Sequence, residues 1–133
     1  MQINQTLSKI WFGRVVWFGV LVNWAFAFWV LFGDANTLME MLDLGEPQST
    51  LWLYNYSVLL VILSLFYIPA ARDCVRYRVN AWLLIVGRLI PAFIYFVGVA
   101  MGFMPDGFLL LGLADATIGF IELWLLLRIV RTE

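Results

Sequence analysis

Residues 15–33 read VVWFGVLVNWAFAFWVLFG and contain no charged side chain. A helix of about 20 apolar residues is long enough to cross the roughly 30 Å hydrocarbon layer of a lipid bilayer. A run of this length and composition therefore predicts a transmembrane helix rather than a buried helix of a soluble protein.

Three further apolar runs follow along the chain. Residues 51–71 carry no charge, and the runs at 79–103 and 108–130 carry few. Because every backbone polar group must be satisfied inside the lipid, continuous apolar runs of this kind form helices. The short connections between the later runs place those helices side by side in opposite directions. We expect an all-α fold in which one domain, residues 1–133, forms an integral membrane antiparallel four-helix bundle, with spans at about 11–33, 51–71, 79–103 and 108–130.

The composition agrees with a membrane protein and excludes several classes of function. The 133 residues are 64% hydrophobic and 13% charged, whereas soluble domains contain about 45–50% apolar and about 25% charged residues. The chain has no histidine and a single cysteine, Cys74, so it lacks the usual ligands of haem, zinc and iron–sulfur clusters. We expect no covalently bound or metal cofactor and no nucleophilic triad. With a net charge of −1 and one lysine, we also expect no nucleic-acid partner.

The segment between the first two spans, residues 34–50, has the pattern of a short helix. Thr37 and Glu40 match the T-x-x-E capping box that opens helices, and Gly45 and Pro47 match a helix stop. We expect a short surface helix that lies at the membrane interface; an ordered loop is the alternative. The apolar face of this helix would consist of Leu38, Met41 and Leu42.

Basic residues gather on one side of this topology. The connection at 72–78 holds Arg72, Arg76 and Arg78, while the opposite side has acidic residues and no lysine or arginine. Because Lys and Arg collect on the cytoplasmic side of membrane proteins, we expect this basic loop and both termini in the cytoplasm. The same asymmetry favours a multi-pass protein of the bacterial inner (cytoplasmic) membrane. The other residues that set the direction are Lys9, Arg14, Arg128 and Arg131 on the basic side, and Asp34, Glu40, Asp43, Glu46 and Asp106 on the acidic side.

Three charged residues fall well inside the predicted spans. A charge at the centre of a membrane helix costs about 2.5–3.5 kcal/mol on insertion scales, so each needs a partner or a function. Asp115 and Glu122 are seven residues apart and share one helix face, and Arg88 on the neighbouring span falls between them in depth. We expect Arg88 to lie within hydrogen-bonding reach of Asp115 or Glu122, in a buried polar network that also includes Asn23 and Tyr95.

Small residues accompany these charges on the last two spans. They allow two helices to approach closely in lipid, where packing replaces the hydrophobic effect as the driving force. The Arg88 network is interpreted first as a structural lock between helices, and second as a site for protons or a ligand. The expected helix-packing residues are Gly98, Gly102, Gly112, Ala116 and Gly119.

Two short stretches resemble a known family. The run Arg14-Val-Val-Trp-Phe-Gly19 at the start of the first span, and Gly-Leu-Ala-Asp115 in the last span, are similar to the DoxX-like group of small four-helix bacterial membrane proteins. The resemblance covers the four-span architecture of the whole chain. It implies an association with membrane complexes that oxidise quinols or handle electrons, often as an accessory subunit, and it transfers no catalytic residue.

Three functions are compatible with these features. The first is a non-catalytic accessory or assembly subunit of a larger membrane complex in electron transfer or quinone chemistry, with lipids and other membrane subunits as partners. The second is a small quinone- or lipid-binding membrane protein or enzyme with a polar site around Arg88, Asp115 and Glu122. The third is a conduit for protons or small solutes. We expect the first, and with it no enzymatic activity.

Overall fold

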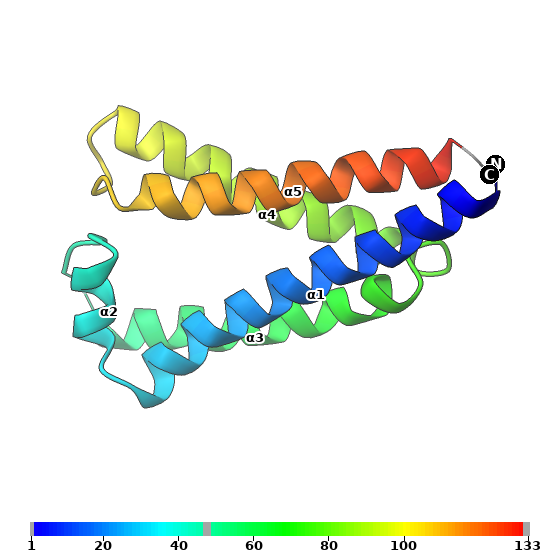
Figure 1. Ribbon diagram of the computed structural model, residues 1–133. Helices are drawn as coiled ribbons and strands as arrows, with labels where there is room; N and C mark the ends of the chain where they lie inside the picture. Colours follow the sequence, from blue (N-terminus) through cyan, green and yellow to red (C-terminus); the bar gives the residue numbers. More distant parts are fainter. Residues whose placement is uncertain (1, 47–48, 132–133) are drawn as a thin grey trace.

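Five helices make up most of the chain in the computed structural model, which describes the backbone of residues 2–46 and 49–131. No β-strand occurs in these two described ranges. Four of the helices are long and one is short (Figure 1). Their bounds are α1 Gln2–Phe32, α2 Ala35–Met41, α3 Thr50–Arg72, α4 Arg78–Ala100 and α5 Phe108–Val130.

The four long helices confirm the predicted all-α membrane bundle. Each contains an apolar segment of 23 or 27 residues with a mean hydropathy between 1.8 and 2.1, which is long and apolar enough to cross a bilayer. The chain is therefore a multi-pass membrane protein. Two predicted boundaries differ: α1 begins well before residue 11, and α4 ends before residue 103. The four segments are Thr6–Phe32, Thr50–Arg72, Arg78–Ala100 and Phe108–Val130.

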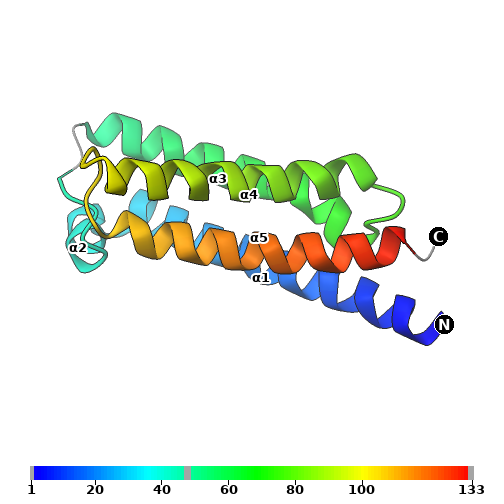
Figure 2. The ribbon, with the colours of Figure 1, turned by 90° about the horizontal axis from the view of Figure 1, so that it is seen from above.

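The spans form an antiparallel ring (Figures 1 and 2). α1 packs against α3 and α5, and α4 packs against the same two helices, so that α1 and α4 lie on a diagonal. α1 begins and α5 ends at the end of the bundle where α3 connects to α4, and α2 lies at the opposite end. Figure 1 shows the pair α1/α3 spreading away from the pair α4/α5 toward the end that holds α2.

The buried apolar core consists of two separate clusters. The larger cluster joins all four spans near the end where α1 begins, and the smaller one joins α2 to α1, α3 and α5 at the opposite end. The two clusters close the bundle at both ends, and buried polar side chains occupy the middle. Prominent members are Phe12, Leu84 and Leu126 in the larger cluster, and Val30, Leu38 and Met39 in the smaller one.

α2 confirms the short helix predicted between the first two spans, but a different residue caps it. Asp34 is the N-cap: its carboxylate accepts hydrogen bonds from the backbone N–H of Asn36 (3.0 Å) and from the hydroxyl of Thr37 (2.7 Å). Thr37 lies in the first turn, so the predicted capping box of Thr37 and Glu40 is wrong. Aspartate is at least as good an N-cap as threonine, and here it comes earlier in the chain.

The C-terminal end of α2 also differs from the prediction. Asp43 has a left-handed backbone (φ 51°), and the N–H groups of Asp43 and its successor bond back to the helix as in a Schellman cap. The helix therefore stops before Gly45, and the predicted stop at Pro47 lies outside the described residues. The Asp43 carbonyl accepts the backbone N–H of Gly107 (3.2 Å), which ties this turn to the α4–α5 connection.

α2 packs between the spans, and its buried face differs from the predicted one at one position, because Met39 rather than Met41 is buried. Leu38 and Met39 are 7% and 6% exposed, whereas Met41 is 67% exposed. Leu42 packs against the smaller core cluster, as predicted for a residue of the apolar face. α2 thereby fills the space between the spread ends of the spans and closes this end of the bundle.

The predicted small residues of α5 lie at its contact with α4, whereas those predicted near the end of α4 do not lie at a helix contact. Added Cβ atoms at Gly112 and Gly119 would meet α4 at 2.9–3.4 Å, so these glycines permit the close α4–α5 contact; Ala116 between them is half-buried. Gly98 instead faces the connection that follows its own helix, and Gly102 lies beyond α4 with φ 75°. Because the left-handed Gly102 ends the helix, the expected packing of Gly98 and Gly102 against a neighbouring helix does not form.

Candidate functional site

Arg88 lies on α4 between the two carboxylates of α5. Its Nη1 donates a hydrogen bond to Asp115 Oδ1 at 3.0 Å, and its Nε lies 3.3 Å from Glu122 Oε2. The two acids lie two turns apart on one face of α5, so a single guanidinium reaches both. The sequence predicted a contact with one of the two acids, and the fold provides contacts with both.

The other two spans also meet Arg88. Gly19 on α1 has no side chain, and a Cβ added there would collide with Arg88 Nη2. On α3, the ring centroid of Tyr67 lies 5.9 Å from the guanidinium carbon, within the range of a cation–π interaction. One arginine therefore contacts all four membrane helices.

The charge cluster, defined here as Arg88, Asp115 and Glu122, is buried and incompletely paired. The exposed fractions of the side chains are 3%, 30% and 0% in that order. Within the described part of the chain, both oxygens of Glu122 and the Nε and Nη2 atoms of Arg88 lack a hydrogen-bond partner, so the Glu122 contact is an ion pair without hydrogen-bond geometry. With all groups ionised, two carboxylates face one guanidinium and the cluster sums to −1.

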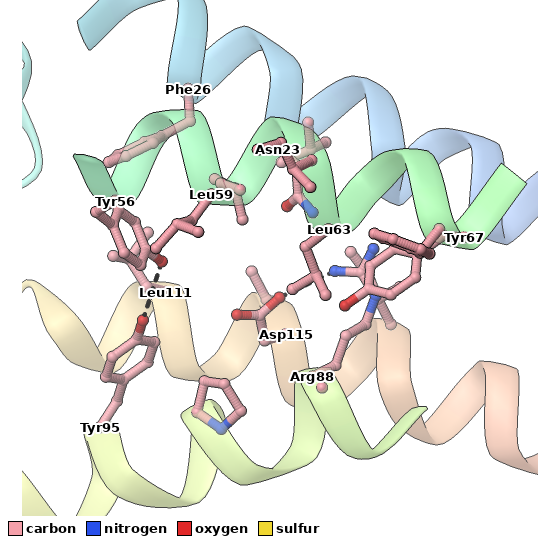
Figure 3. Close-up of a pocket in the computed structure, with 18 residues that line it drawn as sticks. Asn23, Phe26, Tyr56, Leu59, Leu63, Tyr67, Arg88, Tyr95, Leu111 and Asp115 are labelled. Atoms are coloured by element: carbon pink, nitrogen blue, oxygen red, sulfur yellow. Dashed lines mark hydrogen bonds and ion pairs between the residues drawn. The ribbon is translucent and has the colours of Figure 1, made fainter. Parts of the chain in front are cut away.

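A cavity of about 480 Å³ lies beside the charge cluster, between the two core clusters. All four spans contribute to its wall, and most of the lining side chains are apolar. Figure 3 shows the cavity with Arg88 and Tyr67 at one end and Tyr56 and Tyr95 at the other. The lining includes Val22, Asn23 and Phe26 of α1, Tyr56, Leu59, Leu63 and Tyr67 of α3, Arg88, Pro91 and Tyr95 of α4, and Leu111, Ala114, Asp115 and Ile118 of α5.

Two hydrogen-bond acceptors point into the middle of the cavity (Figure 3). Asn23 Nδ2 donates to Ser64 Oγ (3.1 Å), which donates in turn to the carbonyl of Leu60 (2.8 Å). This chain engages the amide nitrogen of Asn23 and leaves its Oδ1 available. Asp115 Oδ1 is bonded to Arg88, whereas Asp115 Oδ2 has no donor among the described residues.

The far end of the cavity is bridged by two tyrosines. The hydroxyls of Tyr56 on α3 and Tyr95 on α4 lie 3.4 Å apart, and either can donate to the other. The ring of Phe26 on α1 meets Tyr56 edge-on, with centroids 6.5 Å apart. Because one hydroxyl proton is enough for the bridge, the pair retains a second proton for another acceptor.

The five residues of the predicted polar network separate into two groups. Three of them form the charge cluster, whereas Asn23 and Tyr95 line the same cavity and bond to other partners. Gly19 and Tyr67 also belong to the site, although the sequence pattern did not predict either of them. Gly19 lies one turn before Asn23 on the same helix face, and this spacing is the one sequence signal that places Gly19 near the polar network. No sequence signal indicates that Tyr67 lies there.

The remaining predicted residues lie away from this site. Arg72, Arg76 and Arg78 are exposed at the α3–α4 connection and do not line the cavity. Within residues 2–46 and 49–131, no group of three His, Cys, Asp or Glu side chains is placed to hold a metal ion. Comparison of the chain with protein-family models, curated proteins and solved structures finds no match. Inferences about function therefore depend on the cavity and on the charge cluster.

Proposed function

We propose that the protein binds a lipophilic small molecule or lipid of the bilayer in the central cavity, with the polar end of the ligand against Asp115 and Asn23. The observation that carries the proposal is the cavity itself. Its volume of about 480 Å³ falls within the range of about 300–1,000 Å³ that is typical of ligand pockets. Its apolar wall with a few convergent polar atoms is the composition that such pockets have.

The position of the cavity supports entry from the side. Both ends of the bundle are closed by core clusters, whereas several lining residues are exposed on the flanks, including Val22 on α1, Leu59 on α3 and Ala114 on α5. In a membrane these flanks face acyl chains. A ligand that is already dissolved in the bilayer can therefore reach the cavity without crossing either headgroup layer.

A cavity-blocking variant tests this proposal. Ala114→Trp adds a large side chain at the cavity wall, while Leu113→Trp adds the same side chain at a neighbouring position that is 57% exposed and outside the cavity. The proteins would be purified in a mild detergent and examined by native mass spectrometry. We expect a retained lipophilic ligand in the wild type and in Leu113→Trp, and its loss in Ala114→Trp. Equal occupancy in the two variants would contradict the proposal.

The accessory-subunit hypothesis and the resemblance to the DoxX-like group stay predictions. The broad apolar surface of the spans does not favour a protein partner, because lipid covers such surfaces equally well. The same purification distinguishes the two functions. Stoichiometric co-purification of other membrane subunits favours the accessory role, and a lone protein that carries a quinone or lipid favours binding.

For the membrane orientation, we infer that the α2 end faces outward and the α3–α4 connection faces the cytoplasm of a bacterial inner membrane. The support is the charge asymmetry between the two ends. In a Cys74→Ala background, Glu46→Cys on the α2 side and Arg76→Cys on the opposite side provide exposed labelling positions. We expect a membrane-impermeant maleimide to label Glu46→Cys in intact cells and Arg76→Cys only after lysis. The reverse pattern would overturn the orientation.

A further inference from the structure

The charge around the cavity limits the kind of ligand that it can hold, an inference that rests on the proposed function. The wall includes one carboxylate with an unengaged oxygen, Asp115 Oδ2. The guanidinium of Arg88 also lines the cavity, but two carboxylates share its single positive charge and its Nη1 is already bonded to Asp115. The charge cluster beside a ligand therefore carries more negative than positive charge, and Asp115 Oδ2 and Asn23 Oδ1 are open acceptors toward the cavity.

The buried charges do not balance within the protein. Glu122 is fully buried, and its only counter-charge in the described residues is Arg88, which Asp115 also uses. With all three groups ionised, the charge cluster thus has one more negative charge than positive charges. In a medium of low dielectric constant, an unbalanced charge is costly and attracts a counter-charge strongly. A single positive charge near Asp115 would bring the site to neutrality.

Aromatic side chains in the wall add a second feature that suits a cation. Phe26, Tyr56, Phe66 and Tyr95 line the cavity in addition to the Tyr67 ring that faces Arg88. The faces of such rings attract organic cations, and the attraction is stronger where water is excluded. A cationic head between these rings and Asp115 would leave its apolar substituents against the leucine side chains of the wall.

From the charge count and the aromatic wall, we infer that the cavity selects lipophilic organic monocations, in which an ammonium or similarly diffuse positive centre carries apolar substituents. The positive centre lies against Asp115 Oδ2, and the aromatic side chains of Tyr56 and Tyr95 lie toward the other end of the cavity. Anionic amphiphiles of the same size are rejected, because they would add a further negative charge to a cluster that already carries an excess of one.

Two probes of matched shape and opposite charge test this selectivity. Tetraphenylphosphonium is a lipophilic monocation, tetraphenylborate is the corresponding monoanion, and benzophenone serves as a neutral aromatic probe. Binding to the full chain would be measured by equilibrium dialysis in an uncharged detergent, with empty micelles as the blank. We expect the cation to bind at least about tenfold more tightly than the anion, a ratio that corresponds to about 1.4 kcal/mol.

Removing one charge separates the contribution of Asp115 from that of the apolar wall. Asp115→Asn keeps the size of the side chain, and Asp106→Asn in the exposed α4–α5 connection is the matched control. Asp115→Asn should weaken binding of the cation by about tenfold or more and change binding of benzophenone by less than about twofold. Asp106→Asn should leave both affinities unchanged.

The outcomes distinguish the two proposals. If benzophenone binds but the cation has no advantage over the anion, the cation inference is wrong and the cavity proposal stands; this is the result expected if a proton balances the extra carboxylate. If no probe binds, both proposals fail. Should Asp115→Asn not fold, as judged by gel filtration and circular dichroism, Ala114→Trp provides the second test. It blocks the cavity without altering a charge, and it must abolish saturable binding of the cation.

Discussion

The guanidinium of Arg88 occupies the space that any side chain at position 19 would need. α1 and α4 lie on a diagonal of the helix ring and do not pack directly against each other. Arg88 therefore makes the contact that their backbones do not make, and Gly19 is the residue that admits it. With Tyr67 on α3 and the two acids on α5, this arginine connects the whole ring at the level where the apolar core is interrupted.

A methyl group at position 19 should destabilise the bundle. In Gly19→Ala the new Cβ collides with the guanidinium of Arg88, which must move away from Asp115 or push α1 outward. Overpacking of this kind costs about 1–3 kcal/mol. We expect a lower midpoint of thermal unfolding in detergent, followed by circular dichroism. Ala25→Val, which adds bulk on the exposed side of the same helix, should leave the midpoint unchanged. Equal midpoints for the two variants would show that a Cβ atom at position 19 does not collide with Arg88.

Removal of Arg88 alone should be more damaging than removal of the entire charge cluster. Arg88→Leu leaves Asp115 and the fully buried Glu122 without a counter-charge, and breaking a buried ion pair in this way costs about 3–5 kcal/mol. We expect a large loss of folded protein, measured as the monodisperse fraction after gel filtration. The triple variant, in which both acids are also leucine, should recover much of that yield, because apolar replacement of a whole buried ion cluster is close to neutral.

The two arms of this experiment exclude different explanations. If Arg88→Leu retains the wild-type yield, the charge cluster contributes nothing to the assembly of the helices. If the triple variant is as poor as the single one, the arginine acts through its packing on Gly19 and Tyr67 rather than through its charge.

The spans were predictable because an apolar run of membrane length permits few other structures. The runs at 15–33 and 51–71 contain no charge, and Asp115 and Glu122 in the last run are spaced so that they share one helix face. The proximity of Arg88 to the acids of α5 was predictable from its depth between them and from the small residues on the two helices, since adjacent antiparallel helices bring residues of similar depth together.

Other features depend on choices that the sequence pattern leaves open. Asp34 and Thr37 are both good N-caps, and the fold uses the earlier one. The left-handed Asp43 was not predictable, because aspartate adopts this conformation much less often than glycine. The cavity depends on how far the two helix pairs spread at the end of the bundle that holds α2. The hydrophobic pattern of the sequence does not predict that spread. The contact between the hydroxyls of Tyr56 and Tyr95 was therefore not predictable from the sequence.

The cap of α2 should depend on pH. The hydroxyl of Thr37, followed by the backbone N–H groups of Asn36 and Thr37, lowers the pKa of Asp34 below its usual value of 3.8. A folded-state pKa below the unfolded value stabilises the folded helix at pH values above the unfolded pKa, and that stabilisation disappears as the pH falls through the folded pKa. We expect protection of the α2 amides from hydrogen exchange, corrected for intrinsic rates, to be constant from neutral pH to about pH 5 and to decline below about pH 4.

An uncharged cap provides the control for that experiment. Asp34→Asn keeps a side-chain oxygen that can accept from Asn36 and Thr37, because asparagine is an equally good N-cap, but it does not titrate. Protection of α2 in this variant should not change over the same range of pH. A decline of equal size in both proteins would assign the effect to some other group.

Cys74 should react slowly with thiol reagents, although it lies in the short connection between α3 and α4. Its side chain is 3% exposed within the larger core cluster, and burial raises the pKa of the thiol. Because the thiolate is the nucleophile, burial and a raised pKa both reduce the rate of alkylation. We expect N-ethylmaleimide at pH 7.5 to modify Cys74 at least about tenfold more slowly than the exposed cysteine of Arg76→Cys in a Cys74→Ala background. Denaturation in dodecyl sulfate should bring the two rates together, and equal rates in the folded proteins would show that the connection does not hold Cys74 in the core.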